Sequence, residues 1–204
     1  AICAADSVKM VDAQGVPVWA ITVFGLVIVA VVYATSYISG SHINPAITIS
    51  YWATGRMYAG TAAYYIMSQM LGAVMAAYFL SLLFPDAVST VFLGTCTLGE
   101  GVGSWKAASI ECLATFLFVF TIFVTAVDKR TSKLLAGVAI GLVYLFGVSI
   151  SITFSGGSLN PARVFGPAVV SGHFDYHYVW WIGPVSGAIV AGFIYSKVFK
   201  RKRG

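Results

Sequence analysis

The chain has 204 residues, of which 59% are hydrophobic and only 9% are charged. Soluble domains carry roughly one quarter charged residues, so this composition excludes an ordinary soluble domain and indicates a membrane protein. The formal net charge is +5, but the basic residues gather in two short stretches, 128–133 and 197–203, and form no groove-sized patch. Nucleic-acid binding is therefore not expected, and the basic stretches are better explained by orientation in a membrane.

Five apolar stretches are long enough to cross a bilayer, which takes about 20 helical residues. In chain order they are 17–38, 58–83, 106–127, 134–154 and 178–199. A long loop rich in glycine, serine and threonine is expected over 85–105, and a shorter loop over 171–177. Residues 1–5 resemble the end of a further apolar segment.

Two short segments lie between these stretches and share the order Ser-Gly followed by Asn-Pro-Ala. The Asn-Pro pairs at 44–45 and 160–161 each predict a helix start, because asparagine favours the N-cap and proline favours the first helical position. About ten helix-compatible residues follow in each case, 45–54 and 161–170, and span roughly 15 Å, half of a hydrocarbon core of about 30 Å. Two such half-helices entering from opposite sides would meet at the middle of the membrane and form a pore.

The chain repeats itself with a shift of 116 residues, which places Asn44-Pro45-Ala46 on Asn160-Pro161-Ala162. We expect one channel domain over 1–204, with a first repeat over 1–83 and a second over 106–199. The counterpart of 106–127 would begin before residue 1, so the first transmembrane helix is expected to be largely missing from this sequence. Because an odd number of spans separates the half-helices, they should enter from opposite faces.

The distribution of basic residues predicts a cytoplasmic C-terminus, since positive charge gathers on the cytoplasmic side of membrane proteins. With that orientation most lysines and arginines face inward, and only Lys9 and Lys106 face outward. The inward-facing residues are Arg56, Lys129, Arg130, Lys133, Lys197, Lys200, Arg201, Lys202 and Arg203.

Two Asn-Pro-Ala motifs at this spacing, the second followed by Arg163, resemble the aquaporins, the major intrinsic protein family. The resemblance implies an all-α membrane protein with an inverted repeat of six transmembrane helices and two half-helices. It also implies a homotetramer in the lipid bilayer with one pore per subunit, and no cofactor or metal.

The resemblance further places an outer constriction at Phe24, Val148, Gly157 and Arg163. Strictly water-selective members usually carry histidine at the place of Val148, so this chain departs from the pattern there. Valine and glycine offer no imidazole and little bulk, which predicts a wider and less polar constriction. A charge inside a membrane usually lines a water-filled path. The alternative for Arg163 is a buried ion pair with Glu111.

Two further positions are supporting candidates. His42 corresponds to a pore-facing histidine near the cytoplasmic mouth in the family, and its alternative is a histidine bonded to local backbone. Glu111 is expected to bond backbone groups behind the second half-helix loop. At the centre, Asn44 and Asn160 can each donate a side-chain N–H group to a passing water molecule.

These features predict a passive channel for water that excludes protons and ions. Val164, Ala168, Trp180 and Trp181 are closer to the water-channel pattern than to that of glycerol-conducting relatives. The alternative is a broader channel for small neutral solutes such as ammonia, urea, peroxide or glycerol, and a remote alternative is a junctional membrane protein. An enzyme is not expected, because no HExxH, GxSxG or carboxylate pair is present. The membrane is expected to be the plasma membrane or an internal, vacuolar-type membrane.

Overall fold

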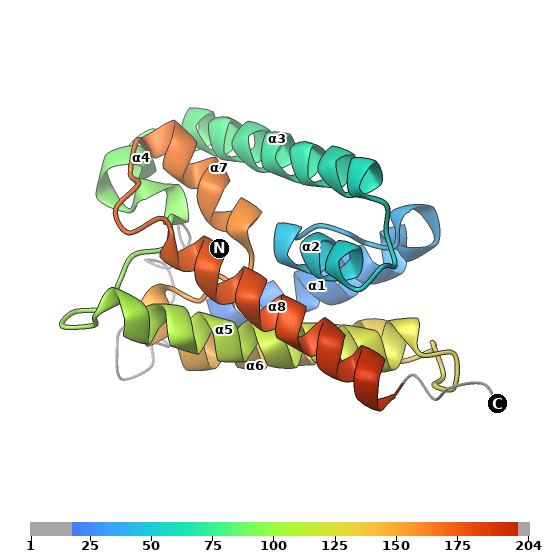
Figure 1. Ribbon diagram of the computed structural model, residues 1–204. Helices are drawn as coiled ribbons and strands as arrows, with labels where there is room; N and C mark the ends of the chain where they lie inside the picture. Colours follow the sequence, from blue (N-terminus) through green and yellow to red (C-terminus); the bar gives the residue numbers. More distant parts are fainter. Residues whose placement is uncertain (1–17, 200–204) are drawn as a thin grey trace.

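The computed structural model describes residues 18–199, so the expectation for residues 1–5 lies outside the described residues. All regular structure within 18–199 is helical (Figure 1). Five helices are long and apolar enough to cross a membrane. They are α1 (Val18–Ser39), α3 (Ala59–Leu83), α5 (Ser104–Ile122), α6 (Ala136–Ser155) and α8 (Val179–Val198). Each helix matches a predicted span, and the observed and predicted ends differ by at most two residues. For α5 this comparison includes the helical turn that follows it, Phe123–Val127.

The two predicted half-helices are also present, as α2 (Pro45–Ala53) and α7 (Pro161–Ser171). Each begins at the proline of its Asn-Pro-Ala motif, and the preceding asparagine has the extended backbone of an N-cap. The asparagine Oδ1 accepts the N–H of the motif alanine at 2.9 Å in α2 and 3.0 Å in α7. Each cap thus satisfies one of the N–H groups that a helix start leaves unpaired.

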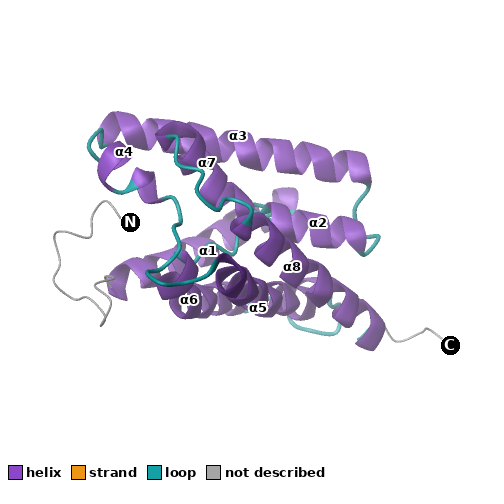
Figure 2. Ribbon diagram, turned by 60° about the vertical axis from the view of Figure 1, so that its left-hand side comes forward, coloured by secondary structure: helices purple, strands orange, loops and turns teal. Residues whose placement is uncertain are grey.

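The half-helices lie inside the bundle. Figures 1 and 2 show α2 and α7 between α3 on one side and the group formed by α5, α6 and α8 on the other. Three long helices, α3, α5 and α6, separate α2 from α7 along the chain. The half-helices therefore enter from opposite faces and bring their N-termini together near the centre.

Two segments differ from the prediction. The stretch 85–105 was expected to be an irregular loop, but it contains the short helices α4 (Ala87–Thr90) and η2 (Phe92–Gly94). They form because Ala87 and Leu93 are buried against Ala77 of α3. In addition, α5 does not continue as a regular α-helix to Val127, because its last turn is the wider π-helix η3 (Phe123–Val127).

The helices of the second half, α5, α6 and α8, are more deeply buried than α1 and α3 of the first half. Half of the residues in the most apolar window of α8 are buried, whereas only 6% are buried in α3. The reason is that α5 packs against both α6 and α8. The approach of α8 to α5 is close at Gly187 of α8, where a Cβ atom would lie 2.1 Å from the carbonyl oxygen of Cys112 of α5. Among residues 18–199, no helix covers α1 and α3 in the equivalent way.

Candidate functional site

The two motif asparagines are joined at the centre of the bundle by reciprocal hydrogen bonds. Asn44 Nδ2 donates to the carbonyl oxygen of Leu159 at 2.8 Å, and Asn160 Nδ2 donates to the carbonyl oxygen of Ile43 at 3.1 Å. Each amide thus bonds to the residue that precedes the other asparagine. Because an amide has two N–H groups, one remains on each side chain after this bond is made. The arrangement fixes both amides where the two half-helices meet.

Glu111 of α5 bonds to the loop that leads into α7. Its carboxylate accepts the N–H of Ser158 at 2.9 Å, the N–H of Leu159 at 2.7 Å and the hydroxyl of Ser155 at 2.6 Å. Glu111, Ser158 and Leu159 are all fully buried. Since Leu159 also supplies the carbonyl that binds Asn44, the carboxylate stabilises the position of both half-helix starts.

Two aromatic side chains hold the same loop from other directions. Trp180 of α8 donates its indole N–H to the carbonyl oxygen of Ser155 at 2.8 Å. Tyr144 of α6 donates its hydroxyl to the carbonyl oxygen of Ser158 at 3.2 Å. Both rings are buried, so the loop is bonded on several sides by groups that have no solvent competitor.

The four residues expected at the outer constriction form two contacting pairs. The Arg163 guanidinium of α7 lies over the ring of Phe24 of α1, 5.6 Å from its centroid. Gly157, in the loop before α7, is in contact with Val148 of α6: a Cβ atom on this glycine would lie 3.0 Å from Val148 Cγ1. Gly157 also has a positive φ of 65°, a conformation that favours glycine.

Arg163 does not form the alternative ion pair with Glu111. Its Nη1 donates instead to the carbonyl oxygen of Gly94 at 2.8 Å and to Cys96 Sγ at 2.7 Å. Its buried Nε has no hydrogen-bond partner among the described residues. The contacts with Gly94 and Cys96 could not be found from the sequence, because these residues lie more than 60 positions away in a stretch without a motif.

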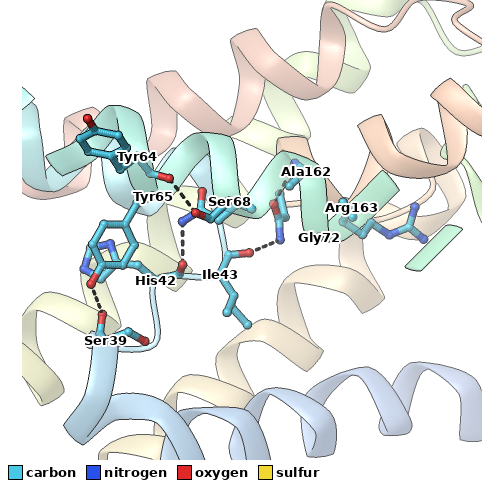
Figure 3. Close-up of a pocket in the computed structure, with 12 residues that line it drawn as sticks. Ser39, His42, Ile43, Tyr64, Tyr65, Ser68, Gly72, Ala162 and Arg163 are labelled. Atoms are coloured by element: carbon cyan, nitrogen blue, oxygen red, sulfur yellow. Dashed lines mark hydrogen bonds between the residues drawn. The ribbon is translucent and has the colours of Figure 1, made fainter. Parts of the chain in front are cut away.

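Two cavities meet at the half-helix starts. A narrow cavity of about 70 Å³ is lined by His42, Asn44, Asn160 and Tyr51, together with apolar side chains of α1, α5 and α6. At about 30 Å³ for each molecule, this volume has room for about two water molecules. A wider cavity of about 630 Å³ lies on the α3 side and reaches Arg163 (Figure 3). His42, Ile43 and Asn160 line both cavities.

His42 is held by side chains rather than by local backbone alone. Its Nδ1 is 3.2 Å from the hydroxyl of Thr48, and its carbonyl oxygen accepts the amide N–H of Gln69 at 2.6 Å (Figure 3). The ring meets those of Tyr51 and Tyr65 edge to face, with centroids 4.5 and 5.4 Å away. The histidine thus has a fixed orientation at the wall shared by the two cavities.

Comparison with known proteins agrees with this architecture. The family described as "Major intrinsic protein" matches residues 2–195. The chain is 39% identical over 177 residues to Aquaporin-4 of Bos taurus, a match that covers 86% of this chain and 54% of that protein. It is 38% identical over 184 residues to Aquaporin TIP4-4 of Zea mays, which covers 88% of this chain and 70% of that protein.

A solved structure has the same fold. It is the X-ray structure of the aquaglyceroporin from Plasmodium falciparum, with a TM-score of 0.78 and 22% sequence identity, covering 88% of this chain and 81% of that chain. The chain spans about half the length of the Aquaporin-4 relatives that it matches. The family match along nearly the whole chain and the similarity to both relatives show that this multi-pass membrane protein belongs to the major intrinsic protein family.

Proposed function

We propose that this chain forms a passive channel that conducts water along an osmotic gradient and excludes ions and protons. The observation that carries the proposal is the meeting of two half-helix N-termini through the reciprocal bonds of Asn44 and Asn160. A relation to aquaporins supports the same function.

The half-helix ends supply the electrostatic barrier. The aligned peptide dipoles of an α-helix place roughly half a positive charge at its N-terminus. Two such ends facing each other create a positive potential at the narrowest part of the cavity, which repels cations while it leaves neutral molecules unaffected. Among residues 18–199, no acidic side chain lines the narrow cavity to offset this potential.

The asparagine amides supply the barrier to protons. One N–H of each amide is bonded to a carbonyl, and the other is available to a water oxygen. A water that accepts from both amides turns its own hydrogens outward, toward the two ends of the pore. The two chains of water on either side of it then have opposite orientations, which interrupts proton transfer along the file.

The outer constriction sets the size limit. Arg163 lies over the ring of Phe24, and Val148 and Gly157, which pack against each other, have little bulk and no hydrogen-bonding side chain. We therefore keep a broader conduction of small neutral solutes such as ammonia, urea, peroxide or glycerol as the second candidate. The observation that favours it is the pairing of a valine and a glycine at this level.

We further propose the assembly and placement that the sequence predicts. The chain forms one channel domain with repeats over 1–83 and 106–199, assembles as a homotetramer, has a cytoplasmic C-terminus and performs no enzymatic reaction. Its membrane is the plasma membrane or a vacuolar-type membrane. The gathering of basic residues at 128–133 and 197–203 supports the orientation.

Stopped-flow light scattering of proteoliposomes tests the function. Vesicles that contain the purified protein should shrink faster in a hyperosmotic sucrose solution than empty vesicles of the same lipid, and a pH-sensitive dye inside them should report no added proton leak. A rate equal to that of empty vesicles would reject water conduction. Faster relaxation in urea or glycerol gradients would favour the broader candidate.

A further inference from the structure

We propose that Cys96 is a further specificity-determining residue of the outer constriction, acting as a positioning residue that links the Arg163 guanidinium to the loop containing Gly157. This inference rests on the proposed channel function, and it assigns a role to a residue outside the four positions already considered. The sequence predicted no role for this cysteine at the constriction.

The first step is the hydrogen bonding of the thiol. Arg163 Nη1 donates to Cys96 Sγ at 2.7 Å, and Cys96 Sγ donates to the carbonyl oxygen of Gly156 at 3.4 Å. A thiol has a single proton, so the proton directed at Gly156 leaves the sulfur lone pairs free to accept from the arginine. Cys96 is therefore the shared partner of the arginine and of the glycine turn.

The second step is packing. Cys96 is only 2% exposed, and it lies directly against Gly156, where a Cβ atom would come within 3.0 to 3.1 Å of three cysteine atoms. Burial raises the pKa of the Cys96 thiol to about 12, so the group remains a protonated, neutral thiol at physiological pH. The thiol thus fills the space between Arg163 and the loop without adding a charge.

The third step is the construction of the segment that presents the cysteine. Phe92 and Leu93 have positive φ values of 48° and 53°, which non-glycine residues rarely adopt because of steric strain. The strain is held by two anchors: the Phe92 ring stacks on His173 at 4.0 Å, and Leu93 is buried against α3. Such a strained and anchored turn places the Gly94 carbonyl and the Cys96 thiol on the same guanidinium nitrogen.

The consequence is a definite position for the arginine. Arg163 Nη1 donates to Gly94 and to Cys96, both in segment 92–96. These two bonds hold the guanidinium beside this segment, where it lies over the ring of Phe24. If the thiol is removed, one of these two bonds is lost and the guanidinium gains freedom to move. A constriction with a mobile arginine should discriminate less well between water and larger neutral solutes.

The test measures urea and water permeability of proteoliposomes for Cys96→Ala, Cys96→Ser, Arg163→Val and the Cys96→Ala/Arg163→Val double variant. Cys112→Ala is the matched control, because Cys112 lies on α5 away from the constriction. Loss of a hydrogen bond to a charged group corresponds to a change on the order of tenfold in an equilibrium. We therefore expect the urea-to-water ratio to rise roughly threefold to tenfold in Cys96→Ala.

The remaining variants identify the cause. Serine can accept and donate as the thiol does, so Cys96→Ser should keep a ratio near that of the unmodified protein, as should Cys112→Ala. In the Arg163→Val background, Cys96→Ala should add nothing, because the two residues act through one contact. An unchanged ratio in Cys96→Ala, or the same rise with and without Arg163, would overturn the proposal while leaving water conduction standing.

A second measurement is independent of conduction. Thermal unfolding in detergent of the unmodified protein, Cys96→Ala, Arg163→Val and the double variant forms a double-mutant cycle, and a direct contact predicts that the shifts for the two single variants are not additive. Additive shifts would overturn the proposal even if the protein conducted nothing, whereas absent water conduction would reject only the proposed function. If Cys96→Ala cannot be purified, Cys96→Val replaces it as the variant without hydrogen-bonding capacity.

Discussion

Replacement of Glu111 tests how the centre of the bundle is held. In Glu111→Ala the buried N–H groups of Ser158 and Leu159 lose their acceptor, whereas the Ser155 hydroxyl keeps a second acceptor in the Ser151 carbonyl at 3.0 Å. An unsatisfied buried donor costs about 1–3 kcal/mol, so two of them cost about 2–6 kcal/mol of unfolding free energy. In Glu111→Gln only one side-chain oxygen remains as an acceptor, so the cost should be about half of that.

The assay is thermal unfolding of the purified protein in detergent. For chains of this length the melting temperature falls by about 2–4 °C per kcal/mol, so Glu111→Ala should lower it by about 4–24 °C and Glu111→Gln by about 2–12 °C. The matched control is Glu100→Gln, an exposed loop carboxylate for which no change is expected. Water permeability should fall in the same order, because the Leu159 carbonyl that holds Asn44 becomes misplaced.

Two outcomes would contradict the role assigned to Glu111. If Glu111→Ala melted at the same temperature as Glu100→Gln, the carboxylate would not be satisfying the loop N–H groups. A loss of stability with unchanged water permeability would mean that Glu111 stabilises the loop before α7 without fixing the position of the two asparagines.

Three further predictions concern other parts of the bundle. Arg163→Val should admit larger neutral solutes while water still passes, and an unchanged solute panel in proteoliposomes would contradict the assigned constriction. Burial lowers the pKa of His177, whose ring nitrogens have no partner among the described residues, so the unfolded chain binds a proton more readily. Stability should therefore be full above pH 6.5 and decline as the pH falls below it, and His177→Phe should reduce the difference between melting temperatures at pH 7.5 and pH 5.5. Gly187→Ala should destabilise the protein by about 1–3 kcal/mol, since its Cβ would overlap the Cys112 carbonyl, whereas Gly60→Ala, with open space around it, should be nearly neutral in the same melting assay.

The helices and the central pair could be predicted because their signals are local. An asparagine N-cap followed by proline fixes the start of α2 and α7, and uninterrupted apolar runs fix the long helices. The internal repeat then predicts that Asn44 and Asn160 face each other. The expected support of the second loop by Glu111 followed from a family resemblance, and the structure gives its partners as the N–H groups of Ser158 and Leu159.

The wall formed by residues 92–96 could not be predicted, because its conformation depends on distant contacts. The sequence Phe92-Leu93-Gly94 gives no indication that two consecutive non-glycine residues, Phe92 and Leu93, have positive φ. The conformation is stable only because α3 buries Leu93 and because His173 stacks on Phe92. Its bonds to Arg163 connect positions far apart in the chain, for which a single sequence gives no signal.

The basic link 128–133 has two roles, one in orientation and one in helix capping. The sequence alone predicts only that its positive charges orient the chain in the membrane. In the structure it also closes the end of α5: the Thr131 hydroxyl donates to the carbonyl of Val124 at 2.8 Å, and Lys133 Nζ donates to that of Thr125 at 3.2 Å. These are carbonyls of the π-helical turn η3, so the side chains of the link satisfy groups at a helix end that would otherwise lack partners.

The two half-helix starts are therefore supported unequally. The loop before α7 is bonded by Glu111, Trp180 and Tyr144, three buried side chains from three long helices. The loop before α2 is bonded by Gln69 through the carbonyl of His42 and by Asn160 through the carbonyl of Ile43, and its Ser41 hydroxyl donates to the Val32 carbonyl of α1. None of these bonds comes from a buried side chain of a long helix, and Asn44 itself is held by the Leu159 carbonyl of the opposite loop. Because that carbonyl is positioned by Glu111, the geometry of the first asparagine depends on the support of the second half-helix. Damage to the loop before α7 should consequently disturb both asparagines, whereas damage to the loop before α2 should leave Glu111, Trp180 and Tyr144 bonded as they are.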